Sequence, residues 1–367
     1  MLVRWIAALA AFVVVILIGM ITIGNFGTGV DSGSFFDSEG ANSFALIGAI
    51  ALVVGFLVYA GVEYAQTGGF GSIASQFDTR TIVLMPIAVA INIILGATVA
   101  NALKLPIYLD SIGTILVSAL AGPVAGALTG MLSNVLWTYV VPPPFQNGPA
   151  AAFGIVAVVI GVLAGLAGRA GWLRPRLNRP IGELAIGGLV ALAIVIGLGV
   201  YAYVRFYAAG FEFFNPENTD PVFIVIGWLI GLLFAAFVVG FLGLLFLRRD
   251  LTVAYVTVAG VATGLVAALI SAPISANVFG GVTGGGTDFL VAAFRQGGAD
   301  LQTATFQQGV LSDPVDKLVT FFVVYLIIST MARRTKARFP QGERLLERED
   351  AVAGDDGEEG EWRGASA

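Results

Sequence analysis

The sequence contains no cysteine and no histidine among its 367 residues. Without cysteine it cannot form a disulfide bond, use a catalytic thiolate or hold an iron–sulfur cluster. Without histidine it lacks the commonest metal ligand and the usual general base, and a Ser-His-Asp triad is impossible. We therefore expect no enzyme activity, no catalytic residue, no metal site and no cofactor.

Charge is also scarce. Charged residues make up 12% of the chain, hydrophobic residues make up 57%, and the mean hydropathy is +0.90. A typical soluble domain has about 25% charged and about 45–50% apolar residues. This excludes a soluble enzyme, a nucleic-acid-binding domain or a disordered chain as a description of the whole. At about 20 residues per crossing, the sequence predicts an all-α membrane protein with about ten transmembrane helices.

Apolar length and basic flanks locate the spans. They are predicted at 3–24, 43–64, 80–101, 106–121, 123–141, 151–170, 182–207, 221–247, 252–275 and 315–333. The fourth is short, because Gly122-Pro123 ends it and begins the next helix. The first is longer than a signal-peptide core, so we expect it to remain a membrane helix.

Basic residues set the predicted orientation. Ten spans put both termini on one side of the membrane. If that side is cytoplasmic, 15 of the 19 Lys and Arg residues lie inside. The four on or near the outer side are Lys104, Arg205, Arg295 and Lys317. We therefore predict a multi-pass cell-membrane protein with both termini in the cytoplasm.

Two segments outside the spans differ from the rest. The acidic tail, 337–367, has too few apolar residues to fold alone, so we expect it to be disordered and cytoplasmic. The outer segment 276–314 reads as a glycine-rich turn followed by a helix across the outer mouth. A long outer loop of this kind is more often a lid or a binding loop than filler.

Polar residues within spans are costly unless they meet partners or water. They concentrate between positions 92 and 146, at Asn92, Asn101, Asp110, Ser111, Thr114, Ser133 and Asn134. Most of them lie toward the outer half in the predicted orientation. This pattern favours a cavity that opens outward.

Three residues of this region carry two interpretations each. Asp110 is either a ligand-facing carboxylate or an acid favoured by a helix N-terminus, with Lys104 as its partner. Asn134 and Trp137 are three residues apart and share a helix face. They either hold a planar polar ligand or form an interhelical hydrogen bond and an interfacial anchor.

The segment that opens the last predicted span is also ambiguous. Asp313 as N-cap, Pro314 at the first position and Asp316 at the third would make a regular helix start without any ligand. Lys317 would then oppose the helix dipole in the first turn. It therefore needs Asp313, Asp316, Asp110 or an anionic ligand group as a partner.

Small residues recur at four-residue spacing, beginning with Gly96 and Ala100 and continuing with Gly122, Gly126 and Gly130. Such spacing lets helices approach closely. It serves either packing within the bundle or the docking of another membrane subunit. We take Gly96 and Ala100 as the candidate docking residues.

Three segments carry a resemblance to a known family. They are LKLPIYLDSIGTILVSALAGPVAGALTGMLSNVLW, then VFGGVTGGGTDFLVAAF, which is followed by GVLSDPVDKLVTFFVVYLII. Over roughly 80–336 the chain resembles the substrate-binding (S) components of energy-coupling factor (ECF) transporters. The family fold would be a six-helix bundle formed by 80–101, 106–121, 123–141, 151–170, 252–275 and 315–333.

The sequence departs from that family by two extra N-terminal spans and two inserted spans at about 182–247. The implied division is a two-helix extension at 1–78, an S-component-like domain at 79–336 and the tail at 337–367. The resemblance implies uptake of a vitamin-like micronutrient, with a transmembrane coupling subunit and two ATPase subunits as partners beside membrane lipid. No nucleic acid is expected.

The candidate substrate-binding residues are Asn101, Lys104, Tyr108, Asp110, Asn134, Trp137, Asp316 and Lys317. The lysines and Asp110 would fit a zwitterion or an anion, and the aromatic residues would fit a flat heterocycle. A ligand-sensing membrane receptor is one alternative function. A secondary transporter is another, although such proteins often repeat their broken helices and this chain has one broken pair, at 106–141.

Overall fold

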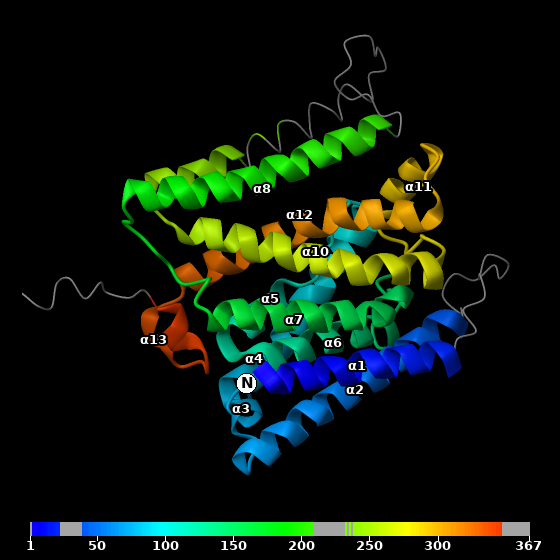
Figure 1. Ribbon diagram of the computed structural model, residues 1–367, viewed down its shortest axis with the longest axis horizontal. Helices are drawn as coiled ribbons and strands as arrows, with labels where there is room; N and C mark the ends of the chain where they lie inside the picture. Colours follow the sequence, from blue (N-terminus) through cyan, green and yellow to red (C-terminus); the bar gives the residue numbers. More distant parts are fainter. Residues whose placement is uncertain (1, 23–38, 209–231, 233–234, 236–237, 347–367) are drawn as a thin grey trace, which may run out of the picture.

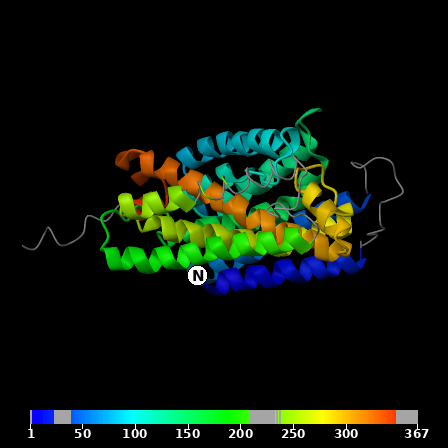
Figure 2. The same cartoon turned by 90° about the horizontal axis from the view of Figure 1, so that it is seen from above.

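The computed structural model describes residues 2–22, 39–208, 232, 235 and 238–346. Within these ranges every regular element is a helix, and the long helices run side by side along one common direction (Figures 1 and 2). Six helices are long and apolar enough to cross a membrane: Val3–Thr22, Leu46–Thr67, Thr79–Ala102, Gly148–Arg169, Ile181–Arg205 and Thr252–Phe279. The all-α class is confirmed for the described residues, and six of the ten predicted spans coincide with helices that could cross a membrane.

The N-terminal extension is a helical pair. Helices α1 (Leu2–Thr22) and α2 (Glu39–Thr67) pack along each other, and the short α3 (Gly71–Ala74) follows. The pair is joined by an ion pair of 3.3 Å between Arg4 and Glu63, both of which are buried. Glu63 also accepts a hydrogen bond from the backbone of Ser72, so the same carboxylate fixes the turn after α2.

The next helices form a broken pair, as expected. Helix α4 (Thr79–Gly96) continues into a π-helical turn, η1 (Ala97–Ala102), and α5 (Ile112–Ala121) and α6 (Pro123–Tyr139) follow. Gly122 separates α5 from α6 with φ +133°, a conformation that favours glycine.

The predicted span 106–121 is wrong in its first third, because the helix begins only at Ile112. Ten residues rise about 15 Å, too little to cross a bilayer. Every residue of α5 is buried, so neighbouring helices surround it in place of lipid.

The remaining helices complete the bundle. They are η2 (Gly148–Phe153), α7 (Gly154–Arg169), α8 (Ile181–Ala208), η3 (Gly243–Leu247), α10 (Thr252–Phe279), α11 (Asp288–Gln296), α12 (Leu301–Thr330), α13 (Arg333–Ala337) and η4 (Gly342–Leu345). The predicted span 221–247 lies mostly outside the described residues, and its end at Val238–Leu247 is helical. The expected helix after the glycine-rich turn is confirmed as α11.

The predicted helix start at Asp313 is wrong. Helix α12 begins at Leu301, and the carboxylate of Asp300 caps it by accepting a hydrogen bond from the backbone of Thr303. Hydrogen bonds from the Thr303 hydroxyl and backbone also lower the pKa of Asp300. Asp313, Pro314 and the residues after them therefore lie in the middle of a long helix.

The expected tail also begins later than predicted. Residues 337–346 fold back on the bundle, where Leu345 is fully buried and the backbone of Gln341 donates to the carbonyl of Leu120. Leu345 belongs to the hydrophobic core, and Phe339 packs against that core. Residues 347–367 of the predicted tail lie outside the described part of the chain.

Basic residues gather at one end of the bundle. The side chain of Arg80 donates to the carbonyl of Arg338, and that of Arg344 donates to the carbonyl of Arg169. Helix α13 lies at this end, and α11 lies at the opposite end (Figure 1). The end that carries α13 therefore holds a group of basic residues.

Glycines let the central helices touch. A Cβ on Gly113 of α5 would lie 2.2 Å from the carbonyl oxygen of Ala88 in α4. A Cβ on Gly264 of α10 would lie 2.4 Å from the Cα of Pro314 in α12. Both contacts are with backbone, which cannot rotate away as a side chain can.

We predict that Gly113→Ala destabilises the protein by about 1–3 kcal/mol, the range of overpacked interiors. The expected measurement is a lower midpoint of thermal unfolding in detergent. Gly197→Ala in α8 is the matched control, because nothing lies within 4 Å of its added Cβ. The control should melt at or slightly above the unchanged protein. Equal midpoints for both variants would contradict the close packing of α4 on α5.

Candidate functional site

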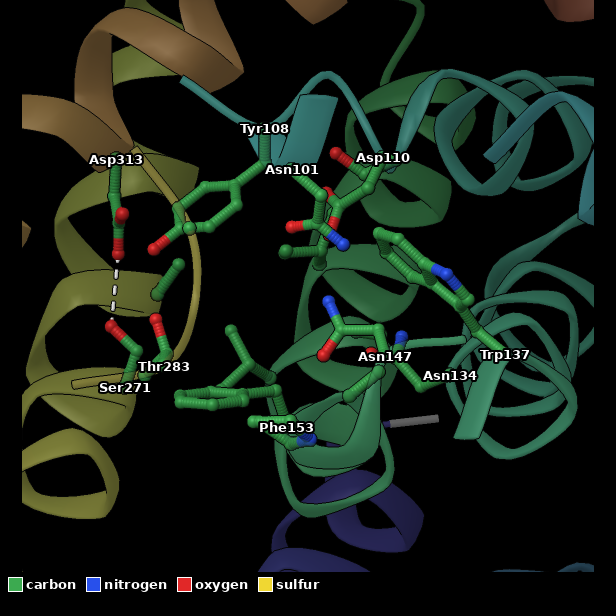
Figure 3. A pocket seen from close by; sticks show the side chains of 18 of the residues that line it. Asn101, Tyr108, Asp110, Asn134, Trp137, Asn147, Phe153, Ser271, Thr283 and Asp313 are labelled. Atoms are coloured by element: carbon green, nitrogen blue, oxygen red, sulfur yellow. Dashed lines mark hydrogen bonds between the residues drawn. The ribbon is translucent and has the colours of Figure 1, made fainter. Parts of the chain in front are cut away.

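A cavity of about 90 Å³ lies at the end of the bundle that carries α11 (Figure 3). Its lining comes from η1, the segment 103–111, α6, η2, α7, α10, α12 and the glycine-rich turn. One buried water needs about 10–15 Å³ in the same measure. The cavity therefore has room for several waters or for the ring of a small organic molecule.

The cavity brings together residues that are far apart in the sequence. Six of the eight candidate binding residues line it: Asn101, Tyr108, Asp110, Asn134, Trp137 and Lys317. Lys104 and Asp316 do not. Further residues that the sequence did not indicate as ligand contacts also line it. They include the polar or aromatic Asn147, Phe153, Ser271, Thr283 and Asp313 and the aliphatic Val156, Ile160 and Ala267.

Lys317 is the centre of a buried charge cluster. Its Nζ lies 2.5 Å from Oδ2 of Asp316, 2.8 Å from Oγ of Ser111 and 3.5 Å from Oδ1 of Asp110. Its three N–H donors thus face three oxygen atoms. The prediction that Lys317 needs an acidic partner is confirmed, and the predicted pairing of Asp110 with Lys104 is wrong.

Asp316 supports the site from behind. It is fully buried, and its Oδ1 accepts hydrogen bonds from the backbone of Tyr108 at 2.9 Å and of Leu109 at 2.7 Å. Leu109 has φ +52°, a strained backbone that these bonds hold in place. Asp316 therefore positions the segment 103–111. It does not line the cavity, and its contact with a ligand stays a prediction.

Lys104 joins two outer loops. Its Nζ donates to the carbonyl of Gly284 at 2.6 Å, and the backbone of Gly286 donates to the carbonyl of Ala100 at 3.1 Å. The hydroxyls of Tyr108 and Thr287 form a third link of 2.7 Å. Lys104 is exposed and does not line the cavity, so it joins the two loops beside it, and its contact with a ligand stays a prediction.

A buried amide joins three helices of the bundle. Asn92 donates to the hydroxyls of Thr114 and Ser133, each at 2.9 Å, and accepts from the backbone of Gly113 at 2.7 Å. These bonds join α4, α5 and α6. The amide is fully used within the protein, so Asn92 fixes the helices and leaves no group for a ligand.

Asn134 and Trp137 share the face of α6 that lines the cavity, as predicted. The indole N–H of Trp137 donates to the carbonyl of Phe145 at 2.8 Å, so only the ring is offered to the cavity. The amide of Asn134 donates to the carbonyl of Gly130 in its own helix. Its carbonyl oxygen remains available as an acceptor.

Gly96 and Ala100 face inward. A Cβ on Gly96 would lie 2.4 Å from the Trp137 ring and 3.0 Å from Cβ of Asp110. Ala100 is 1% exposed. In this structure their small size serves packing within the bundle, and the docking of another membrane subunit on them stays a prediction.

The residues missed from the sequence come from turns and from a helix interior. Phe153 ends η2 and stacks on Phe279, with ring centroids 5.6 Å apart. Asp313 accepts a hydrogen bond from the Ser271 hydroxyl at 2.9 Å, which Figure 3 marks. Asn147 has a buried carbonyl oxygen without a partner among the described residues. These positions follow no regular spacing in the sequence. They come together only because α7, α10 and α12 pack against one another.

The arrangement is suited to binding. Asn101, Tyr108 and Asp110 lie on one side of the cavity, and Asn147 and Phe153 face them (Figure 3). In the described ranges no three Asp or Glu residues come close enough to hold a metal ion. Comparison of the chain with protein-family models, with curated proteins and with solved structures finds no match.

We predict that Lys317→Met destabilises the protein by about 3–5 kcal/mol, because it leaves buried acids without their cation. The measurement is the thermal midpoint in detergent beside that of the unchanged protein. Adding Asp316→Asn should recover part of the loss, since the amide oxygen can still accept from the backbone of Tyr108 and Leu109. A single variant as stable as the unchanged protein would contradict the role of the charge cluster.

Proposed function

We propose that this protein is the substrate-binding membrane subunit of an ECF-type importer and that it takes up a vitamin-like micronutrient. The observation that carries the proposal is the cavity, lined by polar and aromatic side chains, at the end of the bundle opposite the basic residues. By the positive-inside rule the basic end faces the cytoplasm. The cavity then opens toward the outside, with both termini in the cytoplasm of a cell-membrane protein of about ten spans.

The segments that carry the family resemblance support this proposal, because they build the cavity. The segment 103–137 supplies Tyr108, Asp110, Asn134 and Trp137. The segments after position 277 supply Thr283, Asp313 and Lys317. Residues that are more than a hundred positions apart thus meet around one ligand-sized space.

The proposed mechanism uses the two joined loops. A micronutrient enters from outside and is enclosed by the segment 103–111 and the glycine-rich turn. The subunit then reorients in the membrane and releases its ligand to the cytoplasm, with energy from a transmembrane coupling subunit and two ATPase subunits. Membrane lipid covers the apolar side chains exposed on α1 and α8, such as Leu9 and Leu189.

The test is native mass spectrometry of the protein purified from its own membranes in mild detergent. We expect a small molecule bound to the chain, together with a coupling subunit and ATPase subunits. A bound molecule without ATPase partners, with uptake that requires an ion gradient, would contradict the proposal in favour of a secondary transporter. A bound molecule without any uptake would favour a receptor.

We predict that the variant Asn101→Ala weakens ligand binding without disturbing the fold. The Asn101 amide lines the cavity and has no hydrogen bond within the described residues. Its removal should weaken binding of the co-purified molecule about two- to tenfold, the effect of one neutral hydrogen bond. Asn277→Ala is the control, because Asn277 is exposed and bonds to Pro273 and Gln302. Equal affinity of both variants would contradict binding in this cavity.

A further inference from the structure

The cavity and its immediate support hold three acidic side chains and one basic side chain. Asp110 and Asp313 line it and Asp316 lies directly behind, against one lysine, Lys317. With all four ionised, the sum is −3 + 1 = −2. Asp288 adds a further carboxylate nearby, where it accepts hydrogen bonds from the glycine-rich turn.

The ammonium group of Lys317 is already surrounded by oxygen atoms of the protein. Lys317 has oxygen neighbours at 2.5, 2.8 and 3.5 Å, one for each of its N–H donors. An anionic ligand group would have to break one of these contacts. Lys104 does not replace it, because Lys104 does not line the cavity and its Nζ donates to the carbonyl of Gly284.

Asp313 lacks a basic partner. It is 6% exposed, and its oxygens accept from the hydroxyls of Ser271 at 2.9 Å and Ser312 at 3.3 Å. Among the described residues no Lys or Arg nitrogen lies within 4.0 Å of it. A buried carboxylate without a counter-ion is costly, and a bound cation would remove that cost.

Aromatic rings provide the second feature. Trp137, Tyr108 and Phe153 line the same cavity as the two carboxylates. Aromatic faces attract cations through the negative face of the ring and stack on flat heterocycles. Acids and aromatic rings around one space form the chemical environment that favours an organic cation over an anion.

We propose that the ligand is a small organic cation, with a protonated amine or a positively charged heterocycle, and that Asp313 and Asp110 are its counter-ions. This inference rests on the proposed binding function of the cavity. An inorganic cation fits less well, because the described chain holds no cluster of three acidic ligands. The positive group lies between the two carboxylates, and the rest of the molecule lies against the aromatic rings.

The test uses the full chain in lipid nanodiscs and a small-molecule extract of the source cells. The extract is separated by ion exchange at pH 7 into cationic, neutral and anionic fractions. Each fraction is incubated with the protein, and native mass spectrometry records any added mass. We expect the cationic fraction alone to supply a bound molecule.

A bound mass from only the neutral or the anionic fraction would overturn the cation assignment and leave the binding function standing. No bound mass from any fraction would overturn both. If the unchanged protein and its Asp313→Asn variant bind the added mass to the same extent, the binding is adventitious. That outcome also overturns the assignment of a cationic ligand.

The variant Asp313→Asn keeps the shape of the side chain and can still accept from Ser271. It should bind the cation at least tenfold more weakly. Asp300→Asn is the control, because Asp300 is an exposed acid at the start of the same helix and asparagine caps helices equally well. If Asp313→Asn does not fold, Asp110→Asn provides the same comparison, with unchanged affinity again as the contradicting result.

Discussion

The buried ammonium group of Lys317 is the contact on which the site depends. It joins the middle of α12 to Ser111 at the start of α5 and to Asp110. Through Asp316 it also fixes the backbone of Leu109. A lysine inside a membrane protein is stable only among acids, and those acids are the groups that shape the cavity. The charge cluster therefore builds the site, and Asp313, which has no ion pair with Lys317 within 4.0 Å, adds a further acidic group to its lining.

Close packing determines where this cluster can exist. Glycines at the contact of α10 with α12 bring the two backbones together. Gly96 leaves the space into which the Trp137 ring fits. Helix α5 is too short to span a bilayer, but it is enclosed by its neighbours and does not need to reach both faces. The cavity thus results from a short helix, whose missing first turns are replaced by the irregular segment 103–111.

Part of this arrangement could be predicted from the sequence. The spacing of Asn134 and Trp137 predicted a shared face, and the position of Lys317 predicted acidic partners. The start of α12 was missed because Pro314 resembles a first-turn residue and the polar stretch before it resembles a loop. The irregular segment was missed because an apolar run around Pro106 reads as a span. Asn147 and Ser271 belong to the site only through tertiary packing, which no local pattern records.

The proposed function requires a cavity that opens toward the outside of the cell, and the accessibility of Asn101 tests this requirement most directly. The chain has no native cysteine, so Asn101→Cys introduces a single reactive site. We predict that a small membrane-impermeant thiol reagent modifies it in intact cells, and that the molecule which co-purifies with the protein protects it. Modification only after the cells are permeabilised would place the cavity on the cytoplasmic side and contradict the account.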